Sequence, residues 1–471
     1  MKTRHLVTLA VVLGAWSVTS ASAQSAAGAP APTFNKDVAP ILFANCTSCH
    51  RPGEIGPMSL LTFKDARPWA KAIGTRVANG TMPPWHADPA YGQFSNERRL
   101  TNAQKSVIGQ WASSGAPEGR AEDLPPAPKY AEGWNFTPDA ILSMQEDYPI
   151  PATGTVPYQY LEVPANFKED RWITGWEIRP GDRKAVHHII VQMRPGPEQL
   201  AAIQQQMRAA QAAAATPAPG APPAPRPLPV FSFNPSPNLP DGQSGGRPLP
   251  PDQRPAPTPN DRPRPPGTGA PLGGYVPGSG VAYFPEGTAM RLPAGYSLVF
   301  QMHYTPYGKE TTDRTKIGLT FAKTPPKTIL NVAAMLNGGL RIPAGAANHE
   351  VDAEMTINRD VILYSFVPHT HVRGTGWYYE ATYPDGRKEV LLSVPKYDFN
   401  WQHEYVFKEP LKIPAGTKIA AKAWYNNSPS NKSNPDPTKD VTWGDQTWEE
   451  MMYTSITFSI VTAPAPTPPG K

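Results

Sequence analysis

The chain has few of the features that would place it in several common classes. It contains only two cysteines among 471 residues, so disulfide bonds cannot hold its domains together. Beyond the N-terminus, no apolar run approaches the roughly 18 to 20 residues that a membrane span needs. The formal net charge is +5, and it falls to +3 when Lys2 and Arg4 are removed with a leader. A charge so weak and scattered argues against binding to nucleic acid or to a membrane surface.

The N-terminus has the pattern of a cleaved secretory signal peptide. Lys2 and Arg4 precede an apolar stretch from Leu6 to Trp16, and Ala21-Ser22-Ala23 is a small-residue cleavage site. We therefore expect residues 1–23 to be removed and residues 24–33 to be a flexible leader. The mature protein is expected in the periplasm or outside the cell.

The two cysteines lie in the pentad Cys46-Thr47-Ser48-Cys49-His50. Two thioether bonds can attach a haem to this motif, and the histidine that follows is then placed to bind the iron. We therefore predict one covalent haem c, bound through Cys46 and Cys49, with His50 as the proximal ligand.

The second axial ligand of a c-type haem is a Met or a His. Met82 lies in a Thr-Met-Pro-Pro loop before the last predicted helix of this region, and it is the favoured candidate. Met58, His86 and an open coordination position remain as alternatives. A thioether ligand would raise the reduction potential of the haem.

Residues 34–120 have the helical periodicity of a small all-α module. The expected helices are Phe34–Asn45, Lys64–Asn79 and Thr101–Ser114, and the last has a capping Thr101 and a closing Gly115. A helix, haem loop, helix, ligand loop and helix in this order resemble a class I-like cytochrome c domain. Residues 121–154 are interpreted as a linker.

From residue 155 the pattern changes to short strands separated by Gly, Pro, Asn and Asp, which favours all-β sandwich domains. The expected strands are Tyr158–Val163, His188–Val191, Ser297–Tyr304, Ile317–Phe321, Val361–Val367, Trp377–Tyr383, Glu389–Val394, Thr417–Tyr425 and Tyr453–Val461.

One segment interrupts this pattern. Residues 211–275 hold 20 prolines in 65 positions and cannot bury a core, so we expect them to be disordered or PPII-like. The preceding Pro197–Ala214 stretch could form a short helix. The tail 462–471 is expected to be disordered as well.

The remaining candidate ligands are His187-His188, His303, His369-Thr370-His371 and Met451. Residues i and i+2 of a strand point to one face, so His369 and His371 could share an ion. His187 and His188 would point to opposite faces of a regular strand. Taken singly, each motif also fits an ordinary core or surface residue. His403 is interpreted as a half-exposed strand histidine, with contact to substrate or orientation of a ligand as the alternative, and His349 as an ordinary residue near a loop.

The motifs are more informative together. KAVHHIIVQM (184–193), VFQMHYTPYG (299–308), VPHTHVRG (367–374) and GDQTWEEMMY (444–453) resemble, in that order, the ligand motifs of the ascorbate-dependent type II copper monooxygenases. This is the family of peptidylglycine α-hydroxylating monooxygenase and dopamine β-monooxygenase. The resemblance implies two β-sandwich (jelly-roll-like) domains, 155–325 and 326–461, with one copper each and a solvent-filled gap between them.

Carried over by position, the resemblance implies two copper sites. His187, His188 and His303 match the site that relays electrons, and His369, His371 and Met451 match the catalytic site where oxygen is activated. The adjacent Met452 is the alternative to Met451. The family's disulfides are absent here, and no residues match those that anchor the substrate in the two named enzymes.

We therefore expect an exported copper monooxygenase that hydroxylates a C–H bond of a small or peptide-like organic substrate with O₂. The fused haem would supply electrons, with an external donor behind it. An electron-transfer or copper-handling protein without oxygenase activity is the alternative, and a binding module with a sensing haem is the third. The sequence does not specify the substrate or the oligomeric state.

Overall fold

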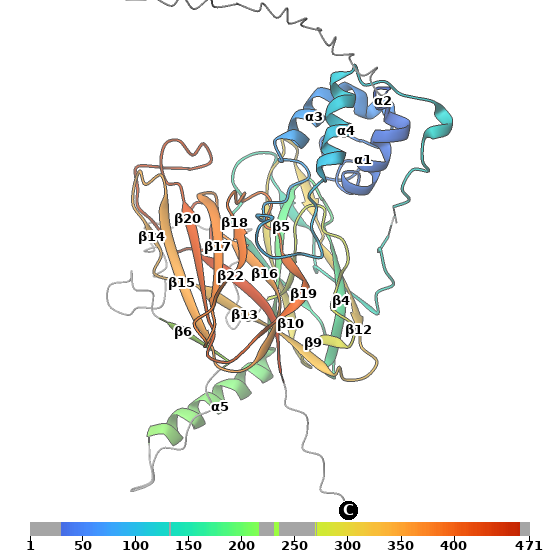
Figure 1. The fold of residues 1–471 in the computed structure, drawn as a ribbon. Coiled ribbons are helices and arrows are strands. Elements are labelled where there is room, and N and C mark those ends of the chain that lie inside the picture. The colour runs from blue at the N-terminus through green and yellow to red at the C-terminus, as the bar shows by residue number, and fades with distance from the viewer. Residues whose placement is uncertain (1–29, 131–132, 216–229, 235–268, 270, 462–471) are drawn as a thin grey trace, which may run out of the picture.

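The computed structural model describes residues 30–130, 133–215, 230–234, 269 and 271–461. The predicted signal peptide (1–23), most of the leader (24–33) and the tail (462–471) lie outside these residues. The described chain is mostly β-sheet, with a small group of helices at its N-terminal end (Figure 1). In these ranges no helix is long and apolar enough to cross a membrane.

Residues 34–113, hereafter the helical module, pack around a small apolar core that includes Phe34, Leu42, Ile108 and Trp111. The elements are the π-helix η1 (Phe34–Val38), α1 (Ala39–Asn45), α2 (Phe63–Ala66), the 3₁₀-helix η2 (Arg67–Trp69), α3 (Ala70–Ala78) and α4 (Asn102–Ser113). The second expected helix is divided into three pieces at Pro68, which lacks a backbone N–H. The third begins with the expected cap at Thr101.

The strands form two groups, which we name the first and second β units. The first unit contains β1 (Ala140–Ser143), β2 (Tyr148–Ile150), β3 (Gln159–Pro164), β4 (Arg171–Arg179), β5 (Val186–Arg194), β7 (Pro271–Tyr275), β8 (Ala282–Tyr283), β9 (Thr288–Leu292), β10 (Ser297–Tyr304), β11 (Thr311–Asp313) and β12 (Lys316–Phe321).

The second unit contains β6 (Phe231–Asn234), β13 (Thr328–Leu336), β14 (Arg341–Ile342), β15 (His349–Ile357), β16 (Val361–His369), β17 (Gly374–Thr382), β18 (Lys388–Val394), β19 (Tyr405–Ile413), β20 (Lys418–Tyr425), β21 (Val441–Thr442) and β22 (Tyr453–Ile460).

The two units share one sheet. Its strand order is β1-β12-β4-β9-β13-β22-β16-β19, with β8 paired to β4, and β9 and β13 join the halves as parallel neighbours. A four-stranded sheet (β3-β10-β5-β7) covers the first half, and a five-stranded sheet (β18-β17-β20-β15-β6) covers the second. The predicted boundary near residue 325 falls between β12 and β13, but the sheet continues across it.

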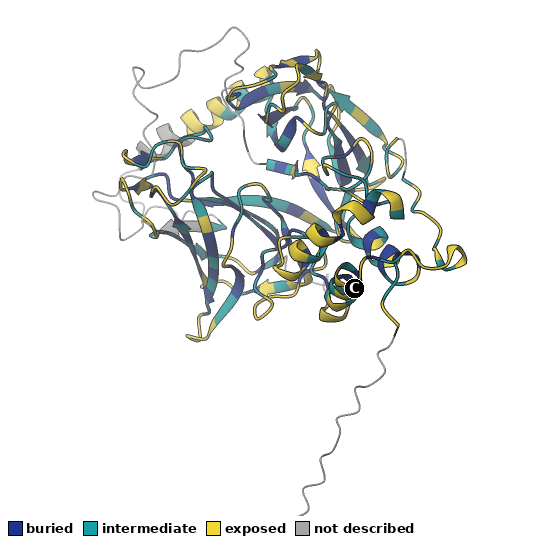
Figure 2. Ribbon diagram, turned by 90° about the horizontal axis from the view of Figure 1, so that it is seen from above, coloured by how far each residue is buried: buried dark blue, intermediate teal, exposed yellow. Residues whose placement is uncertain are grey.

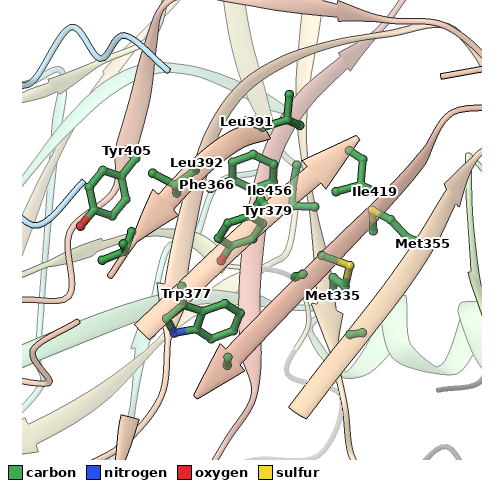
Figure 3. Packing of buried hydrophobic residues seen from close by; sticks show 14 of the residues in the cluster. Met335, Met355, Phe366, Trp377, Tyr379, Leu391, Leu392, Tyr405, Ile419 and Ile456 are labelled. Atoms are coloured by element: carbon green, nitrogen blue, oxygen red, sulfur yellow. The ribbon is translucent and has the colours of Figure 1, made fainter. Parts of the chain in front are cut away.

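Each half has its own core between facing sheets. In the first unit, Ile173 and Ile317 of the shared sheet belong to one buried cluster with Val191 and Phe300 of the covering sheet. In the second, Phe366 and Ile456 lie close to Tyr379 and Leu392 of the opposite sheet (Figure 3). Figure 2 shows buried residues concentrated on the strands, whereas residues 197–209 of α5 (Pro197–Ala215) are largely exposed. This sheet-on-sheet packing agrees with the predicted β-sandwich class.

Two predicted boundaries are wrong. The linker 121–154 contains the 3₁₀-helix η3 (Ala121–Asp123) and the paired strands β1 and β2, so the first β unit begins at residue 140. The segment 211–275 is structured at its described parts, where β6 pairs with β15 and β7 pairs with β5. Composition misled here because a strand of four or five residues can add to a sheet edge without a core of its own.

The helical module contacts both β units through different loops. The loop after the Cys-x-x-Cys-His motif carries Glu54, whose carboxylate forms an ion pair with Arg183, just before β5. The loop after Met82 lies on the second unit, where Phe94 forms an isolated bridge with Phe407 and the Ser95 N–H donates to the Val406 carbonyl at 2.9 Å. The Cys-x-x-Cys-His loop is therefore placed beside the strands that carry the histidines.

Candidate metal and haem centre

Three histidines from two neighbouring strands converge in the first β unit. His188 on β5 lies opposite His303 on β10, and the register shifts by one residue so that Tyr304 then pairs with Val186. His187 is the extra residue of this β-bulge, and a bulge redirects the side chain that a regular strand would send to the other face. Both members of the His-His pair therefore reach the same site.

The donor atoms of this set are close enough to share one ion. The Nδ1 atoms of His187 and His188 are 3.0 Å apart, and those of His303 and His188 are 3.3 Å apart. One ligand atom from each of the three lies within 4.8 Å of the others. Burial, followed by the neighbouring imidazoles, lowers the pKa values of His188 and His303 well below the ordinary range. The rings thus stay neutral, which is the form that binds metals.

The second candidate set lies where β16 ends. His369 is the last residue of that strand, and His371 lies in the loop beyond it, so the strand periodicity expected for this pair does not apply. The loop nonetheless brings the rings together, with centroids 5.2 Å apart. His369 Nδ1 donates to Gln402 Oε1 at 2.6 Å, and His371 Nδ1 donates to the Glu449 carbonyl at 3.2 Å. Each ring thereby presents the lone pair of Nε2 as its metal-binding atom, and His371 Nε2 is buried without a hydrogen-bond partner.

Two methionines precede β22, and their surroundings differ. Met452 belongs to the hydrophobic core of the second β unit, whereas Met451 is buried outside that cluster. Successive residues of an extended chain point to opposite sides, so only one of the two can face the histidines. The packing favours Met451, as the motif alignment does.

Glu450 connects this methionine to the histidine loop. Its fully buried carboxylate accepts three backbone N–H bonds, from His371 at 2.7 Å, Arg373 at 2.8 Å and Met451 at 3.0 Å. Burial raises the pKa of Glu450 to about 7, against the lowering effect of these hydrogen bonds. The carboxylate fixes the relative position of the two chain segments that carry the second donor set.

The two donor sets lie side by side. The rings of His188 and His369 have centroids 6.0 Å apart. Tyr158 lies between the sets, with its ring centroid 4.8 Å from His303 and 5.9 Å from His371. Tyr158 from the first unit and Phe399 from the second each contact histidines of both sets, so aromatic side chains lie between the two sets.

The predicted haem ligands line a cavity of about 1300 Å³ that continues to the three-histidine set. Its walls include Cys46, Cys49, His50, Met82, His187 and His303. Both cysteines are free of disulfide bonding. His50 Nδ1 lies 3.3 Å from the Met58 carbonyl, which orients the ring and leaves Nε2 as its donor.

These contacts bear on the choice of the second axial ligand. Met58, Met82 and His86 all line the cavity. The Met58 carbonyl is the partner of His50 Nδ1, so this backbone segment lies against the ring of the predicted proximal ligand. Met82 stays the predicted second ligand, with Met58 and His86 as the alternatives.

Sequence reasoning missed the residues that orient the ligands. Gln402, Tyr158 and Phe399 carry no motif of their own, and Glu450 was used only as part of the Glu-Glu-Met match. Phe399 stacks on the His187 ring with centroids 5.1 Å apart. His403, interpreted as an ordinary strand residue, is instead buried beside Trp85 of the helical module. His349 begins β15, and the described contacts place no second candidate ligand beside it.

Comparison with known proteins adds little. No protein-family model and no curated protein matches the chain. Among solved structures, a presumed secreted protein from Eubacterium rectale is similar at 11% identity over 36% of this chain and 49% of that protein, with a TM-score of 0.19. The match thus spans about half of that protein's length, and likeness this weak says nothing about fold or function.

Proposed function

We propose that this protein is an exported copper-dependent monooxygenase that hydroxylates a C–H bond of an organic substrate with O₂ and receives electrons through a covalent haem c. The observation that supports it best is the proximity of the candidate donor sets. The cavity beside the Cys-x-x-Cys-His loop is also lined by His187 and His303, and the ring of His369 lies 6.0 Å from the ring of His188. A three-histidine set, a two-histidine set with a methionine, and a Cys-x-x-Cys-His loop come from separate parts of the chain. An ordinary core would not gather five neutral histidines in this way.

The donor atoms fit copper. Imidazole suits both copper oxidation states, and the thioether of Met451 is a soft ligand that favours Cu(I). When bound, copper would supply the one-electron and O₂ chemistry that no protein side chain provides. His187, His188 and His303 would hold one ion, and His369, His371 and Met451 would hold the other.

The protein's own residues would orient these ligands and limit access of water. Gln402 and the Glu449 carbonyl set the tautomers of His369 and His371, so that both present Nε2. Tyr158 and Phe399 occupy the space between the sets and restrict bulk solvent there. The wall of the cavity near Tyr397, Phe399 and Trp401 is aromatic and offers an apolar surface to an organic substrate.

Within this proposal, the helical module is a cytochrome c domain and each β unit is a copper domain. Electrons would enter at the haem and reach the three-histidine site before the site of His369, His371 and Met451. The predicted signal peptide places the reaction in the periplasm or outside the cell.

The test combines metal analysis with turnover. Protein matured with haem should contain one haem and two copper ions, and it should consume O₂ with formation of a hydroxylated product. Met451→Leu, which conserves volume, should lose one copper and abolish hydroxylation while the haem spectrum stays unchanged. The matched control is Met452→Leu in the adjacent core position, which should keep both coppers and activity.

The rival functions give different results. A copper-handling or electron-transfer protein would bind both metals but form no hydroxylated product. A binding module would bind no stoichiometric copper. Loss of activity in Met452→Leu with retention in Met451→Leu would reverse the assignment of the two methionines.

A further inference from the structure

A turn of the first β unit touches the haem motif directly. The turn consists of Val276–Ser279 and follows β7. A Cβ atom added to Gly278 would lie 2.5 Å from Cys49 Sγ and 3.3 Å from an Arg98 nitrogen. Gly278 also has φ of +80°, a conformation that side chains disfavour. Glycine is therefore required here both for the backbone conformation and for close approach to the cysteine sulfur.

The turn is short and well supported by hydrogen bonds. The Ser279 N–H donates to the Val276 carbonyl at 2.9 Å, and the Val276 N–H donates to Ser279 Oγ at 3.0 Å. From the helical module, Arg98 donates to the Gly278 carbonyl at 3.2 Å. These contacts hold the Gly278 backbone against Cys49 from both sides.

From this turn, a short path along the chain and across one strand pairing leads to the histidines. Tyr275, three residues before Gly278, is the last residue of β7 and is paired with Ile189 of β5. Ile189 is bonded to His188, a member of the three-histidine set. The path from the Cys49 sulfur to a candidate copper ligand therefore consists of one close contact with Gly278, three peptide bonds to Tyr275, one strand pairing with Ile189 and one peptide bond to His188.

Resting on the function proposed above, we propose that the Val276–Ser279 turn is the junction through which the haem domain delivers electrons to the three-histidine site, with Gly278 as its positioning residue. The step moves one electron and no atom. Ferrous haem is oxidised to ferric, and Cu(II) held by His187, His188 and His303 is reduced to Cu(I). In the haem-bound protein the Cys49 sulfur is fixed by its thioether bond, so it cannot rotate away from a side chain added at position 278.

The experiment compares glycines chosen to separate backbone strain from a clash with Cys49. Gly278→Ala adds strain and a clash with Cys49. Gly287→Ala adds the same strain, because Gly287 has φ of +78°, but a Cβ there meets nothing within 4 Å. Gly280→Ala, two residues along from Gly278, also meets nothing within 4 Å. Ser279→Ala loosens the turn without a clash and serves if Gly278→Ala does not fold.

Each variant is reduced anaerobically, and the oxidation of its ferrous haem is followed after loading with Cu(II). Haem spectrum, haem reduction potential without copper, copper content and thermal midpoint are measured on the same samples. We expect several-fold slower haem oxidation in Gly278→Ala and Ser279→Ala, at a rate independent of protein concentration. Gly287→Ala and Gly280→Ala should match the unmodified protein.

The outcomes are distinct. Unchanged haem oxidation in Gly278→Ala, with both metals present, would overturn the assigned junction and leave the proposed function in place. Equal slowing in Gly287→Ala would assign the effect to backbone strain and also overturn it. Absence of any copper-dependent haem oxidation in the unmodified protein would overturn the haem-driven mechanism itself.

Discussion

Gln402 is a single side chain that fixes the orientation of the His369 ring. Its Oε1 accepts from His369 Nδ1 at 2.6 Å, and its Nε2 donates to the Phe399 carbonyl at 3.2 Å, so the amide cannot turn around. The pair is buried, and loss of the acceptor would leave a donor without a partner. The orientation of the His369 ring therefore depends on this amide.

Gln402→Leu is expected to weaken copper binding at the site of His369, His371 and Met451 by about 10- to 100-fold, because an oriented ligand loses its hydrogen-bond partner. Copper titration of each site by competition with a chelator measures the effect. Gln402→Glu keeps the acceptor and should retain affinity. Equal weakening at the three-histidine site would argue against a local role.

His403 predicts a dependence of stability on pH. Burial, with the positive charge of Arg98 and the neighbouring His86, lowers the pKa of His403 to about 3, from an unfolded value near 6.5. Between these values the unfolded chain binds a proton that the folded chain does not. Stability from this group is present above pH 6.5 and is lost as the pH falls toward 3, by about 1.4 kcal/mol per pH unit.

Denaturant unfolding of the copper-free protein at pH 7, 6 and 5 measures this slope. His403→Phe suits the aromatic surroundings of Trp85 and Tyr405 and should reduce the slope. Part of the slope should remain, because the other buried histidines also have lowered pKa values. The same slope in both proteins would show that His403 is protonated in the folded state.

For individual residues, the sequence indicated which histidines come together but not how their side chains are oriented. The motifs named His187, His188 and His303 as one set, and the structure brings them together. The bulge that turns His187 toward His188 could not be predicted, because it depends on pairing with a strand more than 100 positions away. Gln402 was missed for the same reason, since only the fold brings it to His369.

Among the elements, the loop that follows the Cys-x-x-Cys-His motif is fixed by one carboxylate. Glu54 is buried and forms ion pairs with Arg51, from its own loop, and with Arg183, from the approach to β5. A partly buried carboxylate between two cations contributes more than an exposed ion pair does.

Glu54→Gln should lower the free energy of unfolding by about 1–3 kcal/mol, because two partly buried guanidinium groups lose their counter-charge. Chemical denaturation followed by haem absorbance and by tryptophan fluorescence measures it. The control Glu122→Gln removes an exposed partner of Arg120 and should change nothing measurable. An equally small effect for Glu54→Gln would mean that this loop is not held by its charges.

Strands were predictable where their residues alternate or are β-branched, and β5, β10, β16, β17, β20 and β22 lie close to their expected positions. Others were missed for identifiable reasons. β19 contains Pro410 and charged residues because it lies at the edge of the shared sheet, where a missing N–H is tolerated. β6 and β7 were missed because they are short strands within a proline-rich sequence.

For the whole molecule, the sequence could not reveal two features. Both β units share one sheet, and both contact the helical module. Local patterns carry no information on which sheets join, since strand pairing between distant segments is decided by the final packing. The consequence is that the candidate metal ligands are positioned by three parts of the chain at once. Weakening a contact between the helical module and a β unit should therefore reduce the cooperativity of unfolding.

Phe94 offers the most direct test of that coupling. It belongs to the helical module's loop after Met82, yet its side chain is buried in the core of the second β unit against Phe407 and Tyr405, with ring centroids 5.3 and 5.6 Å away. Phe94→Ala removes this contact and leaves a cavity, so it should cost about 3–5 kcal/mol. Because the lost contact joins the helical module to the second β unit, the helical module should unfold before the β units.

Thermal unfolding followed at the haem band and by far-UV circular dichroism separates the two events. In the unmodified protein the transitions should coincide, whereas in Phe94→Ala the haem transition should move to lower temperature and separate from the β-sheet signal. Tyr91→Ala, in the same loop but 37% exposed, is the matched control and should keep the transitions together. If Phe94→Ala lowers both transition temperatures equally, the helical module and the β units unfold together. The Phe94 contact then stabilises the whole molecule.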